Sequence, residues 1–75
     1  MQEKQVQIHT DYIQLDQLLK LANVIQTGGQ IRPLLDEEAI QVDNQICREK
    51  RKKIRPGQVV VVNDQIAILV KAQEV

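Results

Sequence analysis

The chain has 75 residues, 43% of them hydrophobic, with a formal net charge of zero and one cysteine, Cys47. This hydrophobic content is typical of a folded globular domain, but a chain this short buries only about 60% of the surface that its unfolded form exposes. These values exclude two lobes around a substrate cleft, an internal disulfide and a cysteine-rich zinc site.

The amino-terminal segment contains a short alternation of apolar residues, with Val6 and Ile8 two positions apart. Alternation of this kind predicts an edge strand. The segment has no continuous apolar stretch of the kind found in signal peptides, and the longest aliphatic run, residues 59–62, is far too short to cross a bilayer. We therefore expect a cytoplasmic protein with no membrane partner.

The next segment has the apolar period of a helix. The residues that repeat are Leu15, Leu18, Leu19 and Ala22. Their spacing of i, i+3, i+4, i+7 predicts a helix over about residues 15–24. Asp16 in the first turn suits the positive end of the helix dipole, and Gly28 is expected to cap the other end.

Residues 27–30, with the sequence TGGQ, have the spacing of a capping box. A second helix is therefore expected to begin at Gly28. Pro33 leaves two alternatives, because a proline inside a helix removes a hydrogen bond and clashes with the preceding turn. Either the helix is kinked there, or its regular part begins with Pro33 at the first position. The expected buried side of this helix consists of Leu34, Leu35 and Ala39.

Three acidic residues, 36–38, close the predicted second helix. Negative charge is mildly unfavourable at the negative end of a helix. We therefore expect a solvated acidic turn or local pairing with a basic neighbour, rather than a metal site.

The apolar period changes to two at Ile40, which predicts strands from there onward. Val42 and Ile46 continue the alternation on either side of Asp43 and Asn44. Both of these polar residues tolerate the positive φ angles of a tight hairpin turn. A first hairpin is therefore expected around them.

Residues 56–57, Pro-Gly, have the signature of a type II turn, since Pro presets the first central φ and Gly supplies a positive second one. Residues 59–62 and 66–70 are rich in β-branched side chains and flank the polar residues 63–65, which predicts a second hairpin. A strand, two helices and then further strands indicate an α+β fold with a small, mostly antiparallel sheet.

Enzymatic chemistry has few candidate residues in this sequence. The only histidine is His9, with no cysteine or second histidine at metal-ligand spacing, and there is no G-x-S-x-G nucleophile motif. Gly28 and Gly29 are not followed by the Lys-Ser/Thr of a P-loop. We therefore expect no catalytic residue, no metal, no cofactor and no small-molecule substrate, and we expect His9 on the surface of a strand.

Residues 48–55, with the sequence REKRKKIR, hold six of the ten basic residues; we call them the basic segment. On many proteins such a segment is a solvated loop, and that interpretation stays open. In a chain of zero net charge, however, it makes the surface dipolar and attracts polyanions locally. Tyr12 is the one aromatic residue, so stacking of bases on several rings is excluded. Any nucleic acid is therefore expected to be held through phosphates and shape.

Several short motifs follow one another in order along the chain. They are Tyr12-Ile13, Leu15, Leu18-Leu19-Lys20-Leu21-Ala22, Thr27-Gly28-Gly29-Gln30 with Arg32, Val42-Asp43-Asn44, Arg48, and Pro56-Gly57. Together they resemble the S4 domain, the RNA-binding αL motif, and most closely its small stand-alone bacterial members of the YaaA type. The resemblance spans residues 12–70 and rests on the ordered set rather than on one piece.

The resemblance implies a single S4-like domain over residues 1–75, with its core at about 12–70, in which two packed helices lie against a small curved sheet. It also implies a non-catalytic protein that binds structured RNA, often ribosomal RNA, and acts in ribosome assembly or translation, with ribosomal particles as expected partners. The positions that match the RNA-binding positions of the family are Gly28, Gly29, Gln30, Arg32, Arg48, Lys50, Arg51, Lys52 and Lys53. Arg55 joins them as part of the basic segment.

The chain departs from the family pattern at three places. Gln14 stands where many members have Arg before Leu-Asp, which removes one expected phosphate contact. Asp43-Asn44 replaces the usual Asn-Gly, a change that should keep the turn. Pro33 follows the basic position Arg32 and affects the expected helix geometry.

An anion site at the second helix is consistent with elementary electrostatics. The amino end of a helix presents unpaired N–H groups and a positive dipole to a phosphate, and Gly28 and Gly29 would let an RNA backbone approach closely. Two rival interpretations remain. The basic segment could dock on an acidic protein partner without nucleic acid, or the chain could be an accessory of an RNA-modifying enzyme whose catalytic part lies in a partner.

Overall fold

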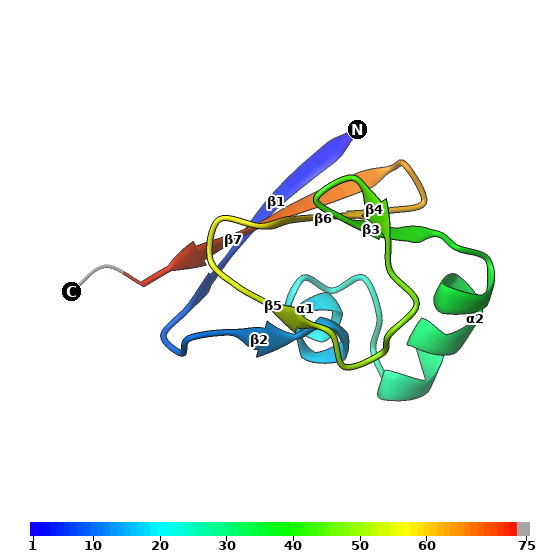
Figure 1. Ribbon diagram of the computed structural model, residues 1–75, viewed down its shortest axis with the longest axis horizontal. Helices are drawn as coiled ribbons and strands as arrows, with labels where there is room; N and C mark the ends of the chain where they lie inside the picture. Colours follow the sequence, from blue (N-terminus) through cyan, green and yellow to red (C-terminus); the bar gives the residue numbers. More distant parts are fainter. Residues whose placement is uncertain (74–75) are drawn as a thin grey trace.

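The computed structural model describes residues 1–73, which include the predicted core. The elements in chain order are β1 (Gln2–Ile8), β2 (Ile13–Gln14), α1 (Leu15–Leu21), the 3₁₀ turn η1 (Gly28–Gln30), α2 (Ile31–Asp36), β3 (Ile40–Val42), β4 (Gln45–Ile46), β5 (Lys53–Ile54), β6 (Val59–Val62) and β7 (Ile66–Ala72). Figure 1 shows the helical segments below the long strands β1, β6 and β7. The α+β class predicted from the order of the elements is confirmed.

The main sheet has five strands in the order β1-β7-β6-β3-β4. β3 pairs antiparallel with both β4 and β6, and β6 pairs antiparallel with β7. β1 runs parallel to β7, in a register that places Gln2 opposite Ile66 and Ile8 opposite Ala72. The sheet is therefore mixed but mostly antiparallel, and the predicted edge strand is confirmed as β1.

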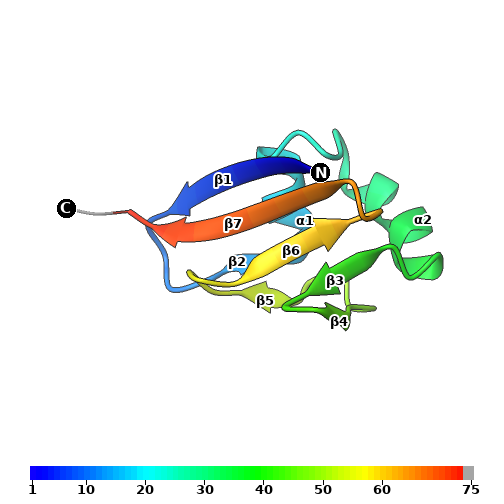
Figure 2. The same ribbon diagram turned by 90° about the horizontal axis from the view of Figure 1, so that it is seen from above.

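The core lies between one face of this sheet and the two helices, which are on the same side of it (Figure 2). Every second residue of a strand faces the helices, because side chains alternate between the two faces of a sheet. These residues pack against the apolar stripe of α1, whose residues recur with the helical period of 3.6. The largest fully buried side chains are Leu15, Leu18, Leu19, Ile31, Ile40, Ile54, Ile68, Val60, Val62 and Val70. Each of them stabilises the fold by about 1.5–3 kcal/mol relative to an exposed side chain.

Helix α1 begins at the predicted residue, Leu15, and ends at Leu21, three residues earlier than expected. Asn23 has a φ of 61°. Its N–H and that of the following residue donate to carbonyls of the last helical turn at 3.1 and 2.9 Å, the two hydrogen bonds of a Schellman motif. The prediction that Gly28 caps this helix is wrong, because Asn also tolerates the left-handed region and stands closer to the helix end.

The second helical segment changes geometry at Ile31, where η1 gives way to α2. The side-chain oxygen of Gln30 accepts the N–H of Thr27 at 3.3 Å, which confirms the Gln30 half of the predicted capping box. Pro33 is the third residue of α2 rather than its first. In the first turn of an α-helix the N–H groups have no partner within the helix, so proline is tolerated there. Glu38, with a φ of 55°, ends this helix.

The predicted turns are confirmed by their backbone angles. Asp43 and Asn44, between β3 and β4, have φ values of 50° and 69°, as a type I′ turn requires. Gly57 has a φ of 94°, and the N–H of Gln58 donates to the carbonyl of Arg55 at 3.1 Å, which together make the type II turn. Residues 63–65 join β6 to β7 as the second hairpin.

Candidate nucleic-acid interface

The basic segment lies across the amino end of α1. The N–H groups of Leu15 and Asp16 donate to the carbonyls of Lys52 and Lys50, at 2.8 and 3.2 Å. These N–H groups are among those that an α-helix leaves without an internal partner. The backbone of the basic segment therefore closes the amino end of α1, while its charged side chains remain available to solvent.

Both ends of the basic segment are fixed by backbone pairing. Before it, the N–H of Cys47 donates to the carbonyl of Ile40 at 2.9 Å. At its other end, β5 pairs antiparallel with β2, and Ile54 is completely buried. This two-stranded sheet was not predicted from the sequence, because each of its strands is only two residues long. The cationic side chains are therefore presented from a fixed backbone.

Lys50 is the member of the basic segment that reaches the second helical segment. A Cβ built on Gly28 would lie 3.8 Å from the Nζ of Lys20 and 3.9 Å from the Nζ of Lys50. The two ammonium groups thus lie within one Debye length of each other, about 8 Å at physiological ionic strength. We call Lys20 and Lys50 the lysine pair.

Lys20 was not among the RNA-binding residues predicted from the sequence. It lies in the last turn of α1, where a cation suits the negative end of the helix dipole. The interaction with the helix dipole is enough to explain a lysine at this position. Nothing in the sequence therefore indicates that Lys20 also takes part in RNA binding. Only the return of the basic segment to the helix brings Lys50 beside it.

The glycines next to the lysine pair have no conformational need to be glycine. Neither Gly28 nor Gly29 has a left-handed φ, and a Cβ on Gly29 would meet no atom within 4 Å. A Cβ on Gly28 would make only ordinary van der Waals contacts with the two lysines. The fold therefore leaves open space over Gly29, while the ammonium groups of the lysine pair stand in ordinary contact distance of Gly28.

The other cations of the basic segment point in different directions. Arg48 forms an ion pair with Glu38 at 3.2 Å, with both side chains more than half exposed, so an acidic residue of 36–38 pairs with a basic one that lies ten positions away in the chain. A pair this exposed adds little stability, about 0–1 kcal/mol. The Nζ of Lys53 lies 4.9 Å from the centre of the Tyr12 ring, a cation–π contact. These cations therefore form a broad surface rather than one pocket.

The remaining predicted residues are exposed. Arg51 and Arg55 belong to the basic segment, and Arg32 lies on α2. The side-chain oxygen of Gln30 is occupied by the cap described above, so Gln30 has a structural role at this position. Within residues 1–73 the Arg48–Glu38 pair is the only ion pair, so the basic segment keeps nearly all its charge unpaired.

Two other kinds of site receive no support from the described residues. Within residues 1–73 no three histidine, cysteine, aspartate or glutamate side chains gather as metal ligands. No helix in that range is long and apolar enough to cross a membrane. His9 is exposed one position beyond β1, close to the surface location expected for it.

Comparison with known proteins gives two results. The family model described as "S4 domain" matches residues 6–71. The chain is also similar to the probable ribosome maturation protein RlbA of Bacillus subtilis (strain 168), with 37% identity over 57 residues, which cover 76% of this chain and 80% of that protein. Both the lysine pair and the basic segment lie within the range matched by the family model.

Proposed function

From the premise that the chain belongs to the S4 domain family, we propose that it is a non-catalytic RNA-binding protein that binds structured ribosomal RNA through backbone phosphates. The observation that carries this proposal is the lysine pair at Gly28, beside a basic segment whose backbone is fixed. Among residues 1–73 these two adjacent ammonium groups form no ion pair, so they repel each other, and a phosphate between them removes that cost.

The proposed RNA-binding residues are Gly28, Gly29, Gln30, Arg32, Arg48, Lys50, Arg51, Lys52, Lys53 and Arg55, to which the position of Lys20 adds an eleventh. The short second helical segment contributes little dipole, so side-chain charge is the main source of affinity. The open space over Gly29, beside the lysine pair at Gly28, suits the close approach of a sugar–phosphate chain.

A role in ribosome maturation is part of the proposal. It rests on the similarity to the Bacillus subtilis relative, whose printed description is a probable ribosome maturation protein. We also propose cytoplasmic localisation, a single S4-like domain over residues 1–75 and the curved sheet of the αL motif, with the family membership as support. Ribosomal particles are the proposed partners.

The test is a salt titration with fragments of bacterial ribosomal RNA. If about four phosphates are contacted, the logarithm of the association constant falls against the logarithm of the salt concentration with a slope of about −3. A flat response would reject phosphate binding. Co-sedimentation with ribosomal particles, compared before and after ribonuclease treatment, distinguishes RNA from an acidic protein partner, since binding to a protein survives the nuclease.

Changing Arg51, Lys52 and Lys53 together to alanine should weaken binding to all RNA fragments and leave the fold intact. The fold is expected to survive because the structure uses the backbone carbonyl of Lys52, and not the side chains, to close α1. Far-UV circular dichroism checks the fold. Loss of folding would mean that the basic segment is structural.

A further inference from the structure

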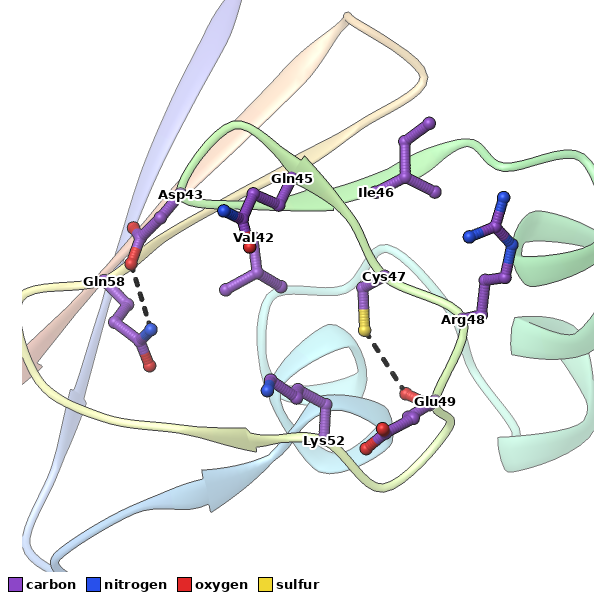
Figure 3. A pocket seen from close by; sticks show the side chains of 9 residues that line it. All are labelled: Val42, Asp43, Gln45, Ile46, Cys47, Arg48, Glu49, Lys52 and Gln58. Atoms are coloured by element: carbon purple, nitrogen blue, oxygen red, sulfur yellow. Dashed lines mark hydrogen bonds between the residues drawn. The ribbon is translucent and has the colours of Figure 1, made fainter.

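A pocket of about 360 Å³ lies between the β3–β4 hairpin and the first half of the basic segment. Figure 3 shows the side chains that line it, which come from Val42, Asp43, Gln45, Ile46, Cys47, Arg48, Glu49, Lys52 and Gln58. Its volume falls at the small end of the range for sites that bind small organic groups, about 300–1,000 Å³. It is therefore large enough for one planar group of modest size.

The floor of the pocket is apolar and fixed. Val42 and Cys47 are each only 7% exposed. The Sγ of Cys47 donates a weak hydrogen bond to the carbonyl of Glu49 at 3.6 Å, so the thiol is held in place. The floor thus offers van der Waals contact to one face of a flat group.

One wall of the pocket is committed to hydrogen bonds within the protein. The Nε2 of Gln58 donates to Asp43 at 3.0 Å, and its Oε1 accepts the N–H of Arg55 at 2.7 Å. The backbone N–H of Val59 also donates to Asp43 at 3.0 Å. This network joins the Pro-Gly turn to the first hairpin at one side of the pocket.

The opposite sides of the pocket carry free polar groups. Within the described part of the chain, the side chains of Gln45 and Lys52 make no hydrogen bond or ion pair, and both residues are exposed. A carboxamide supplies both donors and an acceptor, and an ammonium supplies donors only. Glu49 also lines the pocket, and its carboxylate can only accept hydrogen bonds. The site therefore fits a flat ligand with an apolar face and an edge that carries hydrogen-bond donors as well as acceptors, with Lys52 available to an adjoining negative charge.

We infer that this pocket takes one unstacked nucleobase of the bound RNA, with the adjoining phosphate on Lys52. The inference rests on the proposed function and adds base recognition to it. Lys52 is two residues from Lys50, a chain length of at most about 7 Å. Consecutive nucleotides of one RNA strand can therefore contact the lysine pair and enter the pocket.

The pocket offers a way to recognise a base that does not need several aromatic side chains. Sequence-specific recognition of RNA mostly targets unpaired bases in loops and bulges, which are splayed out and contacted on their edges. With Tyr12 as the only aromatic residue, stacking on several rings is excluded. Packing on Val42 and Cys47, with edge contacts to Gln45, gives a base preference by another route.

The test begins by selecting RNA hairpins with randomised loops for binding to the full-length protein. Each loop nucleotide of the selected RNA is then replaced by an abasic one, which removes the base and keeps its phosphate. We expect one abasic position to weaken binding about tenfold or more, the usual effect of losing one well-recognised base. Replacement at the other positions should have smaller effects.

Two variants connect that base to the pocket. Gln45→Ala should weaken binding to the intact RNA and reduce the effect of the abasic position. Gln41→Ala is the matched control, because Gln41 is a glutamine of the neighbouring strand β3 and is not among the residues that line the pocket. In NMR spectra, the side-chain amide signal of Gln45 should shift with the intact RNA and stay in place with the abasic one.

The outcomes separate the pocket from RNA binding itself. If no abasic position matters while the salt slope stays near −3, the pocket inference is overturned and the proposed function stands. An abasic effect of equal size in Gln45→Ala and wild type also overturns it, since the base then binds elsewhere. If the protein enriches no RNA from the pool, both proposals fail.

Discussion

Neutralising the lysine pair is the most direct test of how the tertiary structure builds the RNA-binding surface. The double variant Lys20→Gln/Lys50→Gln removes two positive charges and keeps a polar side chain at each position. The variant loses the attraction between the charge of Lys20 and the negative end of the α1 dipole, but it also loses the repulsion between the two ammonium groups. Because these effects oppose each other, the free energy of unfolding should change by no more than about 0.5 kcal/mol.

Binding, in contrast, should change strongly. Each phosphate contact contributes about 0.7–0.9 to the salt slope, so losing two contacts reduces a slope of about −3 to about −1.5. Between 50 and 200 mM salt, wild type should lose about 60-fold in affinity and the double variant about 8-fold. The two affinities should therefore differ most at low salt and approach each other at high salt.

Fluorescence anisotropy with a labelled ribosomal RNA fragment measures these slopes, and thermal melting followed by circular dichroism measures stability. Lys71→Gln is the control, because Lys71 lies in the last part of β7, at the end of the molecule opposite to η1 and α2 (Figure 1). It should keep the wild-type slope. An unchanged slope in the double variant would refute the assignment of the lysine pair to phosphate binding.

Four further predictions concern single substitutions. Gly57→Ala should lower the free energy of unfolding by about 1–2 kcal/mol, because the φ of 94° is strained for alanine. Gly28→Ala should instead raise the free energy of unfolding by up to about 1 kcal/mol and still weaken RNA binding. Urea unfolding measures the stabilities and anisotropy measures the binding; equal losses of stability in the two variants would contradict the different roles given to the two glycines. The N–H of Val59 and then the amide of Gln58 lower the pKa of Asp43, so its stabilising contribution is complete above the ordinary carboxyl pKa, about 3.9, and is lost as the pH falls through the lowered value of the folded state. Urea midpoints should therefore fall more steeply below about pH 4 in wild type than in Asp43→Asn, and identical profiles would refute this linkage. Leu19→Ala should cost about 2–5 kcal/mol by leaving a cavity in the core, and a loss below about 1 kcal/mol would show that the site collapses around the smaller side chain.

Much of the local structure could be predicted because it depends on neighbouring residues. The period of α1 and the turn at Asp43 and Asn44 follow from side-chain spacing and from the φ angles that those residues tolerate. The prediction for Gly28 as a helix cap failed because Asn23 offered the same conformation closer to the helix end. Asn and Gly both tolerate the left-handed conformation of a helix cap. Which of the two ends the helix depends on where its residues cease to pack against the core, and the sequence alone does not give that point.

The candidate site could be predicted only in part. The charge of the basic segment is visible in the sequence, but the directions of its side chains are not. Arg48 turns to Glu38 and Lys53 to Tyr12, while Lys50 joins Lys20. Each of these partners lies at least ten positions away along the chain, beyond the reach of any periodic pattern.

The sequence by itself determined the fold class, the positions of the helices and hairpins, and the presence of a concentrated basic segment, since local periodicity, turn chemistry and charge are properties of adjacent residues. The tertiary structure decided the parallel pairing of β1 with β7, the closing of α1 by the backbone of the basic segment, the lysine pair at Gly28 and the pocket beside Lys52. These features join segments distant in the chain, and their geometry depends on how the whole core packs.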